Sequence, residues 1–158
     1  MQPTRRDALV TIAALAVGST AEAQTTFLTP PELDWLKALV DIIIPRTDTP
    51  GASDAGVPLF IDRRFASDPQ LAQSFRSGMK ALDADAQTRF GAAFPALSPR
   101  QQIMLLTPRQ QDSFFRMIKG LTVDGYYTSE ACLTQELGWH GNTFLTEFHG
   151  CTHPEHQG

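Results

Sequence analysis

An all-α fold is predicted for this sequence: a small, irregular helical domain with a long ordered loop and an extended C-terminal tail. The same helix-start signal recurs: a Ser or Thr is followed directly by proline, and a Glu or Gln lies three residues after that Ser or Thr. Apolar residues follow these signals at spacings of three and four, which is the period of a helix. No segment alternates apolar and polar residues over the length of a strand. The 158 residues suffice for one domain with a single core.

The first helix is predicted to begin after Thr29. The Thr29 hydroxyl can accept from the third helical amide while Glu32 reaches back, and the two intervening prolines lie where a missing amide does no harm. Pro45 ends the helix. The apolar residues at helical spacing between these points are Leu33, Leu36, Leu39, Val40 and Ile43.

A second, longer helix is predicted to begin at Asp68 and Pro69. Its apolar residues advance in steps of three or four: Leu71, Phe75, Met79, Leu82, Ala86 and Phe90. A stripe of this kind is more typical of a hydrophobic core than of a cofactor site.

Two further capping boxes follow. The first, Ser98 with Gln101, is expected to open a short helix that runs through Leu106. The second, Thr107 with Gln110, is expected to open a longer helix. The apolar residues of that longer helix are Phe114, Phe115, Ile118 and Leu121.

Two stretches depart from a plain helical bundle. Residues 45–58 are predicted to form a long ordered loop of small residues and prolines, in which Asp48 and Asp54 can cap local turns. Further along, Ser129 is expected to cap a short helix that Gly138 closes. From Trp139 onward the chain is rich in Gly, His and aromatic residues and poor in helix formers. Long irregular segments of this kind usually bind something.

Residues 1–23 are predicted to be a twin-arginine export signal, which leaves residues 24–158 as the helical domain. Arg5 and Arg6 precede a short apolar run, and Ala21 and Ala23 form an Ala-x-Ala cleavage site. The run is shorter than the ~20 residues that span a membrane. The twin-arginine route exports folded proteins, usually with a cofactor in place. A general secretory signal is the alternative, and both place the protein outside the bacterial cytoplasm, in the periplasm.

Composition and motifs exclude several classes of function. The net charge of −4 without basic clusters argues against nucleic acid as a partner. Haem attachment, dinucleotide binding and serine-elbow catalysis each have a sequence motif, and none occurs here. No catalytic and no cofactor-binding residue is therefore predicted, and a self-sufficient oxidoreductase is the least expected class.

The C-terminal tail carries one ligand-like cluster. Its members are His149, Cys151, His153 and His156. Imidazole and thiolate suit zinc or copper, so a periplasmic metal-binding protein is the alternative function, although the spacing matches no standard finger. Cys132 and Cys151 can pair with each other, stay free or bridge to a partner.

Tyr126 and Tyr127 leave two interpretations open. One ring can be buried with a hydrogen-bonded hydroxyl while the other is exposed. Alternatively, the pair and Trp139 can form a contact surface, because Tyr and Trp are favoured at interfaces.

Two segments resemble the gluconate 2-dehydrogenase subunit 3 (small subunit) family. The first segment reads Asp-Ile-Ile-Ile-Pro at 41–45, Asp-Thr-Pro-Gly-Ala at 48–52, Ala-Gly-Val-Pro at 55–58 and Phe-Ile-Asp at 60–62. The second reads Gly-Tyr-Tyr-Thr-Ser-Glu at 125–130, Leu-Gly-Trp at 137–139 and Gly-Cys at 150–151. The resemblance spans residues 29–153.

This resemblance implies a non-catalytic, all-helical (gamma-type) subunit of a periplasmic dehydrogenase complex. FAD would be held by a glucose–methanol–choline-type flavoprotein that oxidises CH–OH groups, with haem c or an iron–sulfur cluster elsewhere in the complex. A cytochrome c subunit would pass electrons on, and any membrane attachment would come through a partner. The small subunit would carry the export signal and support maturation and stability of the flavoprotein. The ending also resembles that of family members that are paired with glucoside 3-dehydrogenases, so the substrate stays open between a sugar, a sugar acid and a glycoside.

The surface that meets the flavoprotein is expected in the loop, the tyrosine pair and the tail. The residues assigned to it are Pro45, Asp48, Pro50, Gly51, Gly56, Pro58, Tyr126, Tyr127, Trp139 and Cys151. Cys151 is a further candidate for a disulfide to the flavoprotein.

Overall fold

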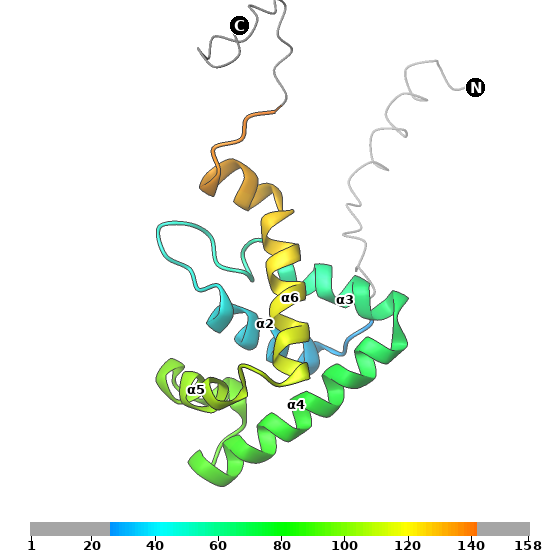
Figure 1. Cartoon of the computed structure of the whole chain (residues 1–158), viewed down its shortest axis with the longest axis vertical. Coiled ribbons are helices and arrows are strands. Elements are labelled where there is room, and N and C mark those ends of the chain that lie inside the picture. Colours follow the sequence, from blue (N-terminus) through cyan, green and yellow to red (C-terminus); the bar gives the residue numbers. More distant parts are fainter. Residues whose placement is uncertain (1–25, 142–158) are drawn as a thin grey trace, which may run out of the picture.

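The computed structural model describes residues 26–141, and every regular element in this part of the chain is helical (Figure 1). The elements are α2 (Pro30–Ile43), α3 (Val57–Ser67), α4 (Pro69–Phe90), η1 (Phe94–Ala96), α5 (Pro99–Leu106), η2 (Thr107–Arg109), α6 (Ser113–Tyr127) and η3 (Cys132–Glu136). The predicted all-α fold class is confirmed.

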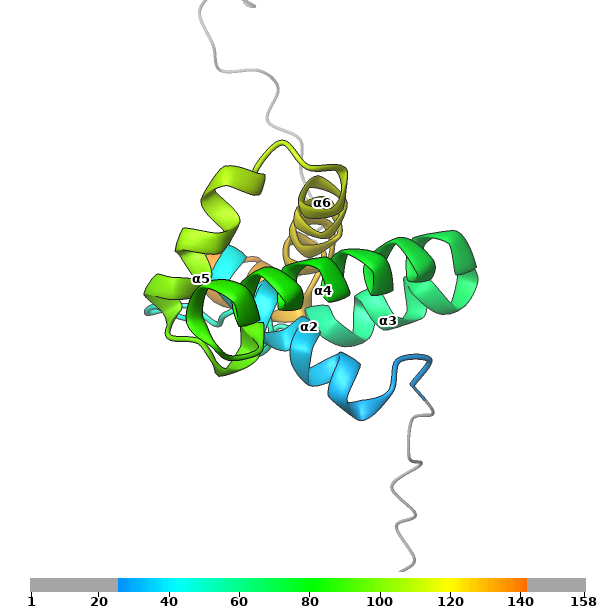
Figure 2. The same cartoon turned by 90° about the horizontal axis from the view of Figure 1, so that it is seen from below.

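Helix α2 lies at the centre of the arrangement. It contacts α3, α5, α6 and η1, while α3 also contacts α4 and α6. The longest helix, α4, crosses the base of the molecule in Figure 1 and passes in front of α2 in the view from below (Figure 2). The central helix is therefore covered from several sides, which explains why Leu36, Leu39 and Val40 are fully buried.

The aromatic centre of the core is Trp35 on α2. Its ring lies 5.8 Å from the ring of Phe75, in an edge-on arrangement, and 5.2 Å from that of Phe94. Its indole Nε1 donates a 2.9 Å hydrogen bond to Asp83 Oδ1, which also accepts from the Phe94 amide at 2.9 Å. A buried Trp needs a partner for its N–H, and Asp83 supplies it while fixing η1. The predicted apolar stripes of α2 and α4 are confirmed as core.

Three of the predicted helix starts are confirmed. Thr29 with Glu32 and Ser98 with Gln101 form complete capping boxes. Asp68 accepts from the amides of Gln70 and Leu71 and so caps α4.

The prediction that Thr107 opens the next long helix is wrong. Thr107 continues the turn of α5 with helical dihedrals, and its hydroxyl donates to the Ile103 carbonyl at 2.8 Å. An N-cap residue other than glycine typically has an extended backbone, and Asp112 (φ −66°, ψ 140°) has that conformation, so α6 begins at Ser113. Thr107 and Gln110 are the residue types of a capping box, but the backbone of Thr107 is helical and not extended.

Helix α3 was not predicted. Gly56 adopts a left-handed conformation (φ 76°) immediately before the helix, and Pro58 lies in the first turn. The loop therefore ends at Gly56, and the last two residues assigned to it belong to α3.

The start of the described chain is fixed by what we call the Asp62 clamp. Asp62 on α3 is 5% exposed, and its carboxylate accepts from the backbone amides of Phe27 (3.0 Å) and Leu28 (2.7 Å). Leu28 is buried, and the guanidinium of Arg76 lies 5.2 Å from the centre of the Phe27 ring. Because a buried carboxylate needs hydrogen-bond donors, these amides both stabilise Asp62 and hold the chain start on α3 and α4.

Glu32 makes the fold sensitive to acid. Arg76 Nε donates to Glu32 Oε1 at 2.7 Å, and this bond, with those from Thr29, lowers the pKa of Glu32 from 4.5 to about 2 against the opposing effect of burial. The pKa in the folded state lies below that in the unfolded chain. Ionised Glu32 therefore contributes fully to the stability of the fold above about pH 4.5, and this contribution is lost as the pH falls towards 2.

Glu32→Gln is expected to lower the free energy of unfolding by about 1 kcal/mol at pH 6, because glutamine keeps the capping box but removes the charge. At pH 2.5 the difference from wild type should shrink, as measured by urea unfolding at both pH values. Asp34→Asn is the control, since Asp34 pairs with Lys37 on an exposed surface. A Glu32→Gln difference that stays constant from pH 6 to pH 2.5 would contradict this assignment.

Candidate functional site

The loop that joins α2 to α3 is ordered by its own backbone contacts. The Ala52 amide donates to the Ile44 carbonyl at 3.0 Å, and the Ser53 amide donates to Asp41 Oδ1 at 2.9 Å. A Cβ on Gly51 would lie 2.8 Å from the backbone nitrogen of Arg46. The two arms of the loop therefore approach too closely for a side chain at this position. The small residues of the loop therefore permit a close approach of backbone to backbone.

An ion pair closes the tip of the loop. Arg46 Nε donates to Asp54 Oδ2 at 2.7 Å, and the same oxygen accepts from the Gly51 amide at 3.0 Å. The hydrogen bond from Arg46 lowers the pKa of Asp54, so the carboxylate stays ionised. Asp54 therefore caps a turn as expected, while Asp48 is exposed.

Tyr126, near the end of α6, lies beneath this loop and is 2% exposed. Its hydroxyl lies 2.9 Å from the Pro50 carbonyl oxygen and 2.6 Å from Glu136 Oε2, both of which can accept its proton. Burial raises the pKa of Tyr126, and the Glu136 carboxylate raises it further, so the hydroxyl stays protonated and can donate. The thiol of Cys132 is buried, and burial raises its pKa as well.

The helix that follows is capped as expected, although its hydrogen bonds are of the π type. Ser129 Oγ accepts from the Cys132 amide at 3.1 Å, and Gly138 is left-handed (φ 63°) just beyond η3. The Trp139 amide donates to the Leu133 carbonyl at 2.7 Å. This turn fixes the backbone of the residues that follow η3.

Exposed apolar side chains lie at the end of α6 and just beyond η3. Tyr127 and Trp139 are each 48% exposed, and Leu137 is 58% exposed. The ring of Tyr127 lies edge-on to that of Tyr126, 5.4 Å away. Of the two interpretations of the tyrosine pair, Tyr126 follows the first, with a buried and hydrogen-bonded ring, while Tyr127 is available for contact. We call the loop (residues 44–56), Tyr127, Leu137 and Trp139 the aromatic surface.

The residues assigned to the partner surface fall into three groups. Exposed positions are Pro45, Asp48, Gly56, Tyr127 and Trp139, and Pro50 is half-buried. Gly51, Pro58 and Tyr126 are buried, so they can shape the surface from beneath but cannot offer much area to a partner. Cys151, the metal candidates His149, His153 and His156, and the export residues Arg5, Arg6, Ala21 and Ala23 lie outside the described residues. Leu137 was not assigned, although an apolar residue beside a helix-closing glycine is a signal that could have indicated it.

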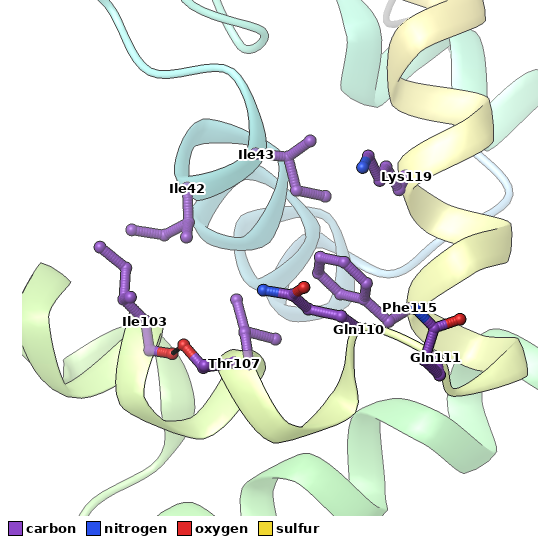
Figure 3. Close-up of a pocket in the computed structure, with 9 residues that line it drawn as sticks. Ile42, Ile43, Ile103, Thr107, Gln110, Gln111, Phe115 and Lys119 are labelled. Atoms are coloured by element: carbon purple, nitrogen blue, oxygen red, sulfur yellow. Dashed lines mark hydrogen bonds between the residues drawn. The ribbon is translucent and has the colours of Figure 1, made fainter.

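A hollow of about 350 Å³ lies between α2, α5, η2 and α6, apart from the aromatic surface (Figure 3). Its walls include Ile42 and Ile43 of α2, Ile103 of α5, and Phe115 and Lys119 of α6. Sequence reasoning did not find it, because its walls come from three separate helices.

Residues 26–141 contain no group of three or more His, Cys, Asp or Glu side chains placed to hold a metal ion. The metal-binding alternative rests on the tail, beyond Gly141, and stays a prediction that metal analysis of the purified protein would test. Among the helices described, none combines the length and the apolar character that crossing a membrane requires.

The fold and the site define a class of protein: a small all-helical domain in which an ordered loop adjoins exposed aromatic side chains. The family model described as gluconate 2-dehydrogenase subunit 3 matches residues 30–144, and the chain belongs to this family. The resemblance seen in the sequence is confirmed. Membership implies the role of a subunit within a multi-subunit gluconate dehydrogenase complex. Neither the curated proteins nor the solved structures gave a significant match.

Proposed function

We propose that this chain is the non-catalytic small subunit of a periplasmic, FAD-dependent dehydrogenase of sugars, sugar acids or glycosides. The observation that carries the proposal is the family match, which covers residues 30–144 and therefore nearly all of the described domain. In this proposal FAD belongs to a glucose–methanol–choline-type flavoprotein, and a cytochrome c or an iron–sulfur protein takes the electrons. The chain itself binds the flavoprotein and supports its maturation and stability.

The aromatic surface is the part of the described chain best suited to that binding. Tyr and Trp side chains bring large contact areas at low cost in conformational entropy, and they are common energetic centres of interfaces. The loop beside them is already ordered by the Arg46–Asp54 pair and by backbone hydrogen bonds. A surface that is ordered before binding loses less entropy when the partner arrives.

The export signal gives the subunit a second task. Arg5 and Arg6 favour a route that carries folded proteins, and the motifs of flavin and haem binding are missing from this sequence. In the proposal, the signal serves the flavoprotein, which folds around FAD in the cytoplasm and is exported while bound to this chain.

Co-expression with a flavoprotein encoded by a neighbouring gene tests both tasks. Wild-type chain is expected to place FAD-linked dehydrogenase activity in the periplasm, whereas the double variant Arg5→Lys, Arg6→Lys should retain both proteins in the cytoplasm. Affinity purification of the chain should recover the flavoprotein in either case. Periplasmic activity of the flavoprotein without this chain would refute the export role, and failure to co-purify would refute the subunit role.

A further inference from the structure

The loop, α6 and η3 meet at the hydroxyl of Tyr126. The Pro50 carbonyl of the loop is 76 residues away along the chain, and Glu136 of η3 is 10 residues away. Both oxygens lie within hydrogen-bond distance of the one hydroxyl, at 2.9 and 2.6 Å, and the ring beneath them is buried. This point joins the loop, α6 and η3.

We propose that Tyr126 is a positioning residue for partner binding: its hydroxyl holds the loop and η3 in the arrangement that the flavoprotein subunit recognises. The inference rests on the proposed function, since it takes the flavoprotein as the occupant of the aromatic surface. The family description as subunit 3 of a dehydrogenase supports this choice of partner.

The geometry explains how one hydroxyl can control several exposed side chains. Tyr127 follows Tyr126 directly and packs edge-on against it. Leu137 follows Glu136 directly in the chain. After the left-handed Gly138, the backbone amide of Trp139 donates a 2.7 Å hydrogen bond to the Leu133 carbonyl, which fixes the position of Trp139. Tyr127, Leu137 and Trp139, the exposed apolar side chains of the aromatic surface, are therefore each within three residues of Tyr126 or Glu136.

A polar cleft of about 290 Å³ is formed by the segments that the Tyr126 hydroxyl joins. It lies between the loop and η3, and its walls include Pro50 and Asp48 on one side and Ala131 and Gln135 on the other. Pro50 and η3 are the two segments that the hydroxyl joins, so its loss would let the walls separate. The partner expected here presents hydrogen-bonding side chains to the cleft and apolar side chains to Tyr127 and Trp139.

Tyr126→Phe tests the proposal, because it removes the hydroxyl and keeps the ring. With the full chain and the flavoprotein, we expect the dissociation constant measured by titration calorimetry to rise about tenfold. Thr88→Val is the control: it removes a hydroxyl that donates to a backbone carbonyl, 2.8 Å from Ala84 O, on the exposed side of α4, and it should change the constant less than about twofold.

Glu136 provides an independent pair of variants. Glu136→Gln keeps an oxygen that can accept from Tyr126 and is expected to bind close to wild type, whereas Glu136→Ala should weaken binding as Tyr126→Phe does. If Tyr126→Phe proves poorly folded, Glu136→Ala carries the test.

Hydrogen exchange separates positioning from a general loss of stability. In Tyr126→Phe, the amides of the loop, such as those of Ala52 and Ser53, should exchange faster, while amides in the middle of α4 should stay protected. Unchanged affinity of folded Tyr126→Phe, with wild-type chain still binding the flavoprotein, would overturn this inference and leave the proposed function intact. Absence of binding by the wild-type chain would overturn both.

Discussion

Replacing Trp35 with alanine is expected to lower the free energy of unfolding by about 3–5 kcal/mol, the largest effect of any substitution considered for this chain. The indole is 4% exposed and packs against three phenylalanine rings, so its removal leaves a large cavity at the centre of the core. Small domains have only about 5–15 kcal/mol of stability, and the variant should therefore melt far below wild type. Thermal and urea unfolding followed by circular dichroism would measure the loss.

Trp35→Phe separates the two contributions of this side chain. Phenylalanine restores much of the buried area but cannot donate to Asp83, so we expect a smaller loss of about 1–3 kcal/mol. A Trp35→Ala variant within about 1 kcal/mol of wild type would show that the ring does not lie in the core.

Replacing Gly78 with alanine is expected to destabilise the protein by about 1–3 kcal/mol, although alanine normally favours a helix. A Cβ on Gly78 of α4 would lie 2.1 Å from Cδ2 of the Phe114 ring on α6. Phe114 would have to move, and with it the contact between α4 and α6. The change in the urea midpoint at constant slope would measure the effect.

Gly120→Ala on α6 is the matched control. This glycine is exposed, and a Cβ there would meet no atom within 4 Å, so the same substitution should stabilise the protein by about 0.5–1 kcal/mol. The two variants are thus predicted to differ in sign. A stabilised Gly78→Ala variant would contradict the close approach of α4 and α6.

The features that the sequence predicted correctly are patterns between residues close together in the chain. The boxes at Thr29 and Ser98, the cap at Asp68 and the stripe of α4 are local patterns, and each is confirmed. The prediction at Thr107 was wrong because its hydroxyl donates to the Ile103 carbonyl in the preceding turn instead of accepting from an amide of the next helix. A capping motif is thus a reliable sign of a helix start only where the preceding helix has already ended.

Helix α3 and the arrangement of the site depend on contacts between distant residues. The small residues and prolines before α3 resemble a loop as far as Pro58, and Asp62 looks like a surface residue until its partners at Phe27 and Leu28 are known. Likewise, sequence reasoning could name Tyr126 as one of two alternatives but could not pair its hydroxyl with Pro50. Which of the two tyrosines is buried was decided by tertiary packing.

The Asp62 clamp also fixes the place on the domain at which the described chain begins. The described chain begins beside α3, whereas the loop and η3 lie on the other side of the molecule, as both views show (Figures 1 and 2). In the function proposed above, a large flavoprotein bound at the aromatic surface would therefore not cover the point at which the proposed export signal joins the domain. The flavoprotein and the export machinery would then bind different faces of this chain.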